Sequence, residues 1–374
     1  MIRWYLIYGY AFVMSCVLAV ALTAVARRVA LRWRVLDHPG ERKMQREPVP
    51  LLGGAAIWLT FYTMIGANLI ALAMAPRLGL SWLEEEVLSF LGSDVKLKLL
   101  GIGIGGLIIF TLGLIDDVVA LRPEGKLIGQ IVAALVLVLC GIRLDLFIPD
   151  VLAGNGWVAL VTGLATVVWV VLMTNSMNLL DNMDGLCAGI SLIAALSFFL
   201  CVFPHQEYFL CVLLLVFAGS AAGFLFHNFN PARIYMGDAG AMFCGYVLAT
   251  VAVLGTFYTS ETPSRVAVAA PLLALSVPIF DTASVIIIRW HRGESIMKGD
   301  KRHFSHRLLK AGMTQRQAVG FIYLVAAVAG LGAALLPKVG GVGTLIILAQ
   351  AAGLFCLIVL LMNAGNGRQS DLNL

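Results

Sequence analysis

The sequence has few charged residues and no CxxC cysteine pair, and both features limit the class of protein to which it can belong. Charged residues make up 13 % and apolar residues 60 % of the 374 residues, whereas an ordinary soluble domain has roughly 25 % charged residues. The seven cysteines are scattered without a CxxC pair, so they indicate neither a disulfide framework nor a zinc site. No internal repeat or soluble linker interrupts the chain. These shortages argue against a soluble globule, and nothing favours a nucleic-acid partner.

The chain does have long apolar runs. A helix needs about 20 apolar residues to cross a bilayer, and eleven runs of about this length can be placed. They lie near residues 5–26, 51–75, 98–115, 127–144, 157–176, 186–203, 208–227, 239–258, 266–288, 317–336 and 341–362. The first run is too long for a signal-peptide core and is expected to be retained. The sequence therefore predicts an all-α polytopic membrane protein of about eleven transmembrane helices, with residues 1–374 forming a single domain.

Basic residues set the predicted orientation. If the loops after the odd-numbered runs face the cytosol, those loops and the C-terminal tail hold 19 of the 26 Lys and Arg residues. Lys and Arg are enriched in the cytoplasmic loops of membrane proteins. We therefore expect the N-terminus outside and the C-terminus in the cytosol.

Four polar residues recur at every third position where the fifth run ends: Asn175, Asn178, Asp181 and Asp184. On a helix end they would form one slowly drifting stripe, whose oxygens can converge on a cation or a ligand. Such groups are costly to leave unpaired at a membrane. The stripe therefore indicates a polar site at the ends of the spans.

Three further acids fall on the same predicted cytosolic face. Asp116 and Asp117 are adjacent, and a hard divalent cation is the usual remedy for their repulsion; a pair of solvated acids is the alternative. Asp238 precedes the eighth run, where an aspartate can simply cap a helix. The agreement of all these acids on one face favours a shared metal site.

The loop over residues 289–316 contains eight Lys and Arg residues and three histidines. It could be only a basic anchor on the membrane surface. However, His303 and His306 would share a helix face, and with Arg302 they suit a diphosphate. Ser305, rotated by about 100° from His306 on such a helix, is expected to matter less.

A second basic segment, which includes Lys43 and Arg46, leads into Pro-Val-Pro-Leu-Leu-Gly-Gly at residues 48–54. The two glycines would allow a close approach of another backbone. By itself this motif is weak.

Taken in order, these motifs resemble those of the polyprenyl-phosphate N-acetylhexosamine-1-phosphate transferases of the glycosyltransferase 4 superfamily. The motifs are Asp37-His-Pro-Gly-Glu-Arg-Lys with Pro48-Val-Pro-Leu-Leu-Gly-Gly, the Asp116–Asp117 pair, Asn178-Leu-Leu-Asp-Asn-Met-Asp-Gly-Leu, Met236-Gly-Asp-Ala-Gly and Asp300-Lys-Arg-His-Phe-Ser-His. The chain looks more like the branch that starts O-antigen, enterobacterial common antigen or teichoic acid synthesis than like the phospho-N-acetylmuramoyl-pentapeptide translocase. That branch often has His-x-His-His where this chain has Ser305 at the third position, which leaves the exact sugar open.

The resemblance implies that undecaprenyl phosphate attacks the β-phosphorus of a UDP-N-acetylhexosamine, foremost UDP-N-acetylglucosamine, and that UMP leaves. This would be the first membrane step of a cell-envelope polysaccharide, in the inner membrane of a bacterium. The expected cofactor is Mg²⁺, with Mn²⁺ as the alternative, and a homodimer is left open. The implied catalytic residues are Asp116, Asp117, Asp238 and His303, of which Asp238 and Asp117 are the implied metal ligands. The implied substrate-binding residues are Lys43, Arg46, Asn178, Asp181, Asp184, Arg302 and His306.

Two other classes share part of the pattern. A secondary transporter is also polytopic, but its coupling residues usually lie near the bilayer midplane. Here only Asp281 lies inside a run, where it could pair with Arg289. CDP-alcohol phosphotransferases also use an Asp-x-x-Asp-Gly element, but after Asp184 this chain has no acid until Glu207. Both alternatives are therefore weaker than the transferase.

Overall fold

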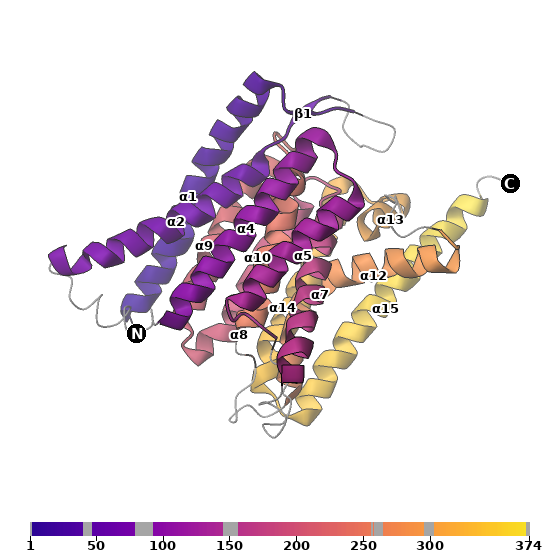
Figure 1. Cartoon of the computed structure of the whole chain (residues 1–374). Helices are drawn as coiled ribbons and strands as arrows, with labels where there is room; N and C mark the ends of the chain where they lie inside the picture. The colour runs from indigo at the N-terminus through magenta and orange to yellow at the C-terminus, as the bar shows by residue number, and fades with distance from the viewer. Residues whose placement is uncertain are drawn as a thin grey trace.

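A computed structural model describes residues 2–39, 47–78, 93–144, 156–255, 257, 265–294 and 303–371, and most of these residues are helical. Figure 1 shows them as a bundle with a small β-hairpin at its upper end. The elements are α1 (Ile2–Trp33), β1 (Leu36–Asp37), β2 (Val49–Pro50), α2 (Gly53–Met74), α4 (Ser93–Val119), α5 (Pro123–Leu139), α7 (Gly156–Leu180), α8 (Leu186–Val202), α9 (Tyr208–Asn228), α10 (Gly237–Leu254), η3 (Arg265–Ala269), α11 (Ala270–Ala274), α12 (Ser276–His291), α13 (Phe304–Lys310), α14 (Gln315–Leu335) and α15 (Gly341–Asp371).

Apart from the ninth, each predicted apolar run coincides with one helix. In the described part of the chain, nine helices are long and apolar enough to cross a membrane. The fourth run forms α5, which has 17 residues and so a length of about 26 Å, slightly less than the roughly 30 Å of a hydrocarbon core. The chain is thus an all-α, multi-pass membrane protein, as predicted. The count of eleven spans and the orientation stay predictions.

The ninth predicted run, 266–288, does not form one straight helix. Its first part, Val266–Ala274, meets α12 at an angle of 75°. Pro271 and Pro278 lie on either side of this bend, and neither can donate a backbone hydrogen bond. Figure 1 shows α12 running across the other helices toward the edge of the molecule. The predicted run is therefore bent rather than straight.

Helices α8, α9 and α10 form the centre of the bundle and are its most buried spans, whereas α15 is the least buried. Helix α10 packs against α2, α4, α7 and α8. This packing is tight because a Cβ atom added at Gly54 of α2 would collide with the backbone of Gly240, and one added at Gly113 of α4 with that of Ala239. The first turn of α10 is consequently surrounded by the ends of its neighbours.

The glycine pair that begins α2 makes the close backbone approach that the sequence predicts. Gly53 N donates to Tyr235 O at 2.9 Å and Gly54 N donates to Met236 O at 2.8 Å. The hairpin of β1 and β2 precedes this contact, with Leu36 paired to Pro50. The N-terminal motif therefore lies directly beside the residues that lead into α10.

Candidate active site

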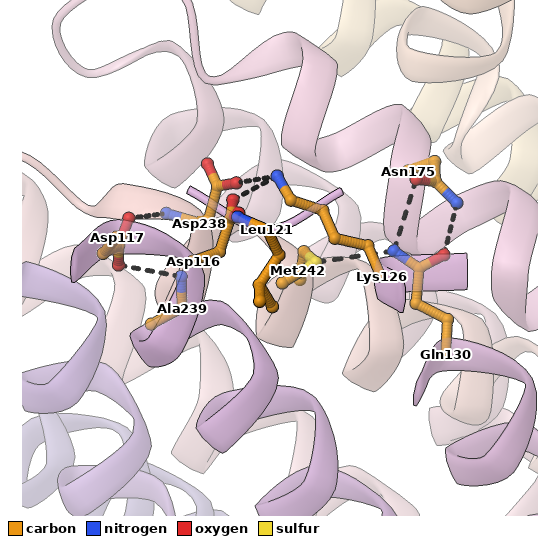
Figure 2. A network of polar contacts seen from close by, with 9 residues as sticks. All are labelled: Asp116, Asp117, Leu121, Lys126, Gln130, Asn175, Asp238, Ala239 and Met242. Carbon is orange, nitrogen blue, oxygen red and sulfur yellow. Dashed lines mark hydrogen bonds and ion pairs between the residues drawn. The ribbon is translucent and has the colours of Figure 1, made fainter. Parts of the chain in front are cut away.

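A lysine joins two of the predicted acids where α4, α5 and α10 meet (Figure 2). Asp116 is in the last turn of α4, Lys126 in the first turn of α5 and Asp238 in the first turn of α10. Lys126 Nζ forms an ion pair with Asp116 Oδ2 and lies 2.7 Å from Asp238 Oδ2. The repulsion expected between acids on this face is thus relieved, for this pair, by a protein ammonium group.

Lys126 is a site residue that the sequence reasoning missed. It stands at the start of an apolar run on the predicted cytosolic face, where a lysine is typical of the positive-inside pattern. One signal could have found it: Lys126 follows the Asp116–Asp117 pair by one short turn. A turn of this kind brings the end of one helix next to the start of the following helix.

The two adjacent acids have different partners. The second oxygen of Asp116, Oδ1, accepts the backbone N–H of Leu121 at 2.6 Å, which closes the turn between α4 and α5. Asp117 instead caps α10 from outside: its Oδ1 accepts Asp238 N at 2.7 Å and its Oδ2 accepts Ala239 N at 3.2 Å. A carboxylate is favourable at a helix N-terminus because the free N–H groups and the helix dipole are positive there. Asp117 therefore fixes the turn that carries Asp238.

Asn178 and Asp181 belong to the same cluster. The Asn178 side chain is within hydrogen-bonding reach of the Asp238 carboxylate. Burial raises the pKa of Asp181 to about 8, and the charges of Asp238, Asp117 and Asp184 add to the rise. A carboxyl group with this pKa is largely protonated at neutral pH unless a cation binds beside it. The cluster therefore carries more acid than its single lysine can neutralise.

The predicted stripe is not a continuous helix face, because α7 ends at Leu180. Asp184 lies in the turn that follows and holds the next loop: its Oδ2 accepts Asn230 Nδ2 at 2.9 Å and Ala232 N at 3.0 Å. Asn175, at the other end of the stripe, pairs with Gln130 of α5. The expectation of one stripe is therefore wrong, although its middle members reach the cluster.

Asn228 is a second residue that the sequence reasoning missed. Its buried side chain accepts Gly185 N at 3.0 Å and donates to Ile234 O at 2.9 Å. It thereby connects the turn after α7 to the segment before α10. An isolated asparagine at the end of an apolar run gave no signal of this role.

His303 is held by the acid inside α12. His303 Nδ1 lies 2.8 Å from Asp281 Oδ2, and Phe304 N donates to Asp281 Oδ1 at 2.5 Å. An ionised carboxylate only accepts, so Nδ1 carries the proton and Nε2 is the nitrogen that can face a substrate. The sequence suggested Arg289 as the partner of Asp281; the carboxylate instead contacts His303 and the backbone of Phe304.

The neighbours of His303 are arranged differently from the prediction. His303 is the N-cap of α13 rather than part of it, so His303 and His306 do not share a helix face, although their ring centroids are 6.5 Å apart. Ser305, which was expected to matter less, is buried and donates from Oγ to Asn182 Oδ1 at 2.6 Å. Ser305 therefore connects α13 to the turn after α7.

Three predicted substrate-binding residues cannot be placed, because Lys43, Arg46 and Arg302 lie outside the described residues. The basic loop 289–316 is described only on either side of residues 295–302. The predicted site residues within the described ranges are Asp116, Asp117, Asn178, Asp181, Asp184, Asp238, His303 and His306.

The cluster offers carboxylate oxygens, which are the ligand type that a hard cation prefers. Within the described residues, no three Asp, Glu, His or Cys side chains already form a metal-binding group. However, the carboxylates of Asp116 and Asp238 converge on one positive group, Lys126 Nζ. Asp117 uses one lone pair on each oxygen for α10, and a carboxylate has about four such sites. Carboxylate oxygens around a shared positive charge fit Mg²⁺ better than a softer metal ion.

The chain is similar to known proteins. The model of "Glycosyl transferase family 4" matches residues 99–256, which run from within α4 to the end of α10. The chain is 32 % identical over 318 residues to the probable undecaprenyl-phosphate N-acetylglucosaminyl 1-phosphate transferase of Bacillus subtilis, covering 84 % of this chain and 81 % of that protein. It is 34 % identical over 334 residues to the decaprenyl-phosphate N-acetylglucosaminephosphotransferase of Mycobacterium tuberculosis H37Rv, covering 83 % and 78 %. A phospho-N-acetylmuramoyl-pentapeptide-transferase of Desulforudis audaxviator is 28 % identical over 351 residues, which is 86 % of this chain and 96 % of the relative.

Proposed function

Because this chain belongs to the membrane-bound glycosyl transferase family 4, we infer that it transfers N-acetylglucosamine-1-phosphate from UDP-N-acetylglucosamine to a polyprenyl phosphate. UMP is the second product. One observation carries the inference: the polar cluster of Asp116, Lys126 and Asp238 lies within the matched residues, at helix ends where a lipid phosphate and a water-soluble nucleotide can meet.

The reaction joins two anionic substrates, so it depends on positioning and on neutralisation of charge more than on covalent chemistry by the protein. Lys126 supplies one positive charge within the cluster. His303, oriented by Asp281, can donate a hydrogen bond from Nε2 to a diphosphate oxygen when its ring is protonated. A phosphate monoester has a second pKa of roughly 6, so the lipid phosphate is largely dianionic at neutral pH. Asp116 therefore serves mainly to position it rather than to remove a proton.

We propose Mg²⁺ as the cofactor, with Mn²⁺ as the alternative, and Asp238 and Asp117 as its ligands. When bound, the ion would act as a Lewis acid and a template for the diphosphate. Asn178, Asp181 and Asp184 would line the nucleotide pocket, and Lys43, Arg46, Arg302 and His306 would meet the phosphates. These roles rest on the family resemblance and on the donor chemistry of the cluster.

For the acceptor we propose undecaprenyl phosphate, in the inner membrane of a bacterium, at the first membrane step of a cell-envelope polysaccharide. The name of the Bacillus subtilis relative supports this choice, whereas the mycobacterial relatives are named for decaprenyl phosphate. The test therefore compares polyprenyl phosphates of both chain lengths as acceptors.

The test is a donor panel on purified protein in detergent, where no compartment exists for transport. UDP-N-acetylglucosamine, UDP-N-acetylgalactosamine and UDP-N-acetylmuramoyl-pentapeptide are each incubated with undecaprenyl or decaprenyl phosphate and Mg²⁺. We expect UMP and lipid-linked sugar in equal amounts from UDP-N-acetylglucosamine, and no UMP without the lipid. Asp238→Asn protein, prepared in parallel, controls for contaminating enzymes. If no donor yields UMP, the transferase function is refuted.

A further inference from the structure

A pair of amide side chains, Gln130 and Asn175, lies beside the acid–lysine cluster (Figure 2). Asn175 Nδ2 donates to Gln130 Oε1 at 2.6 Å, and Gln130 Nε2 donates back to Asn175 Oδ1 at 3.3 Å. The same Gln130 nitrogen lies 3.4 Å from Met242 Sδ, and Asn175 Nδ2 also donates to Val171 O at 2.8 Å. Gln130 is 1 % exposed. The pair, of which Gln130 is buried and Asn175 partly buried, thus connects α5, α7 and α10 through directional contacts.

Gln130 and its neighbour Met242 each lie about one helical turn from a member of the acid–lysine cluster. Gln130 follows Lys126 by four residues on α5, and Met242 follows Asp238 by four residues on α10. Residues four apart lie on the same face of a helix. The side chains that meet at the amide pair therefore belong to the same helix faces as the side chains that meet at the cluster.

We propose that Gln130 and Asn175 are positioning residues of the transferase: their amide pair sets the register of α5 against α7 and α10, and so places Lys126 between Asp116 and Asp238. The proposal rests on the transferase function inferred above. Neither residue touches the reacting groups.

The chemistry of the pair explains why it can set a register. Apolar contacts between helices tolerate small shifts, whereas a single buried polar pair can fix alignment, as an asparagine does in a coiled coil. A buried amide that loses its partner is costly, so the two groups resist sliding apart. Lys126 Nζ lies 2.7 Å from Asp238 Oδ2, and a shift of α5 by about 1 Å would take this contact out of hydrogen-bond range. Misplacement of this size can lower a rate by about 100-fold.

The test uses Gln130→Leu, Asn175→Leu, both changes together, and the exchange Gln130→Asn with Asn175→Gln. Each single change should lower kcat at least tenfold, with the KM for UDP-N-acetylglucosamine within about threefold of the wild type. The double leucine variant leaves neither amide unpaired, so its Tm should recover while its kcat stays low. The exchange keeps one long and one short amide and should restore kcat to within about threefold.

A control is Thr250→Val, which removes a buried hydrogen bond to Tyr246 O on the same α10, twelve residues from Asp238. It should leave kcat within twofold of the wild type. If the double leucine variant has wild-type kcat, or if every variant loses activity only in proportion to its folded fraction, the positioning role is overturned.

A second measurement does not need turnover. Lys126 is labelled with an amine-reactive acylating reagent, and the labelling rate of its peptide is followed by mass spectrometry. The single and double leucine variants should label at least threefold faster than the wild type and the exchange variant, because Lys126 is less firmly paired. Equal labelling in all variants would overturn the positioning proposal, whether or not the wild type is active. Inactivity of the wild type toward every donor would refute the transferase function, and this outcome is separate from the labelling result.

Discussion

Replacing Lys126 by methionine tests whether the ammonium between Asp116 and Asp238 contributes to turnover. Methionine keeps much of the length and the apolar stem of lysine but removes its charge. The change removes the ammonium group that pairs with both carboxylates. We expect a large loss of activity, and its size can be estimated from the geometry.

At the 2.7 Å that separates Lys126 Nζ from Asp238 Oδ2, two unit charges attract by about 6 kcal/mol at an effective dielectric constant of about 20. Water reduces this value, because the Lys126 and Asp238 side chains are 24 % and 31 % exposed. Breaking a fully buried pair costs about 3–5 kcal/mol and an exposed pair about 0–1 kcal/mol. An intermediate loss of about 2–3 kcal/mol corresponds to a roughly 30- to 160-fold lower kcat/KM.

The assay is steady-state UMP release by wild type, Lys126→Met and Lys126→Arg over a range of Mg²⁺ concentrations. Lys126→Arg keeps the charge and should lose less than Lys126→Met. Added Mg²⁺ should rescue part of the Lys126→Met activity, because a second cation can neutralise the same carboxylates. Activity of Lys126→Met within threefold of wild type at every Mg²⁺ concentration would refute the reasoning.

Four further results are expected. Asp117→Asn should lower Tm, because a lost helix cap costs about 0.5–2 kcal/mol. It should also lower turnover at least about 100-fold, or 2.7 kcal/mol. An unchanged Mg²⁺ requirement in this variant would contradict the role of Asp117 as a metal ligand. Asp281→Asn should lower kcat/KM at least about tenfold through loss of a charge-assisted bond to His303, and should add little when combined with His303→Ala. Ser305→Ala should lower kcat/KM by up to about tenfold through loss of about 0.5–1.5 kcal/mol, which unchanged kinetics would disprove. The pKa of Asp181 is raised to about 8 in the folded protein, so ionisation of this carboxyl favours the unfolded chain. The Tm of the metal-free protein should therefore fall from pH 6 to pH 8. Asp181→Asn should reduce this dependence of Tm on pH.

The sequence predicts the helices well because apolar runs of membrane length have few alternatives to a helix. The run predicted at 186–203 is α8, Leu186–Val202, and the run predicted at 208–227 is α9, Tyr208–Asn228. The bend within 266–288 has a local cause, since the two prolines there disrupt backbone bonding without lowering the hydrophobicity. Hydrophobicity therefore locates the spans but does not detect a bend within one.

The site was predictable only in part. Acids at span ends stand out against an apolar chain, which is why Asp116 and Asp238 could be singled out. Which backbone N–H a carboxylate caps depends on a neighbouring helix, so the contact from Asp117 to α10 could not be deduced. Lys126 could be suspected from the short turn after Asp116–Asp117, but its partner on α10, and the role of Gln130, appear only when α5 is placed beside α10 and α7.

The tight packing of Gly54 and Gly113 against the first turn of α10 limits how enzymes of this architecture can diversify. Gly54 and Gly113 leave no room for a side chain against the backbone of α10, so this turn cannot change its chemistry by gaining bulk at those positions. A relative with a larger residue at either position would have to seat α10 differently, and its acids would move with it. Selection for a new donor sugar should therefore act on the loops around the first turn of α10. Mutant libraries built to alter donor preference should leave Gly54 and Gly113 unchanged.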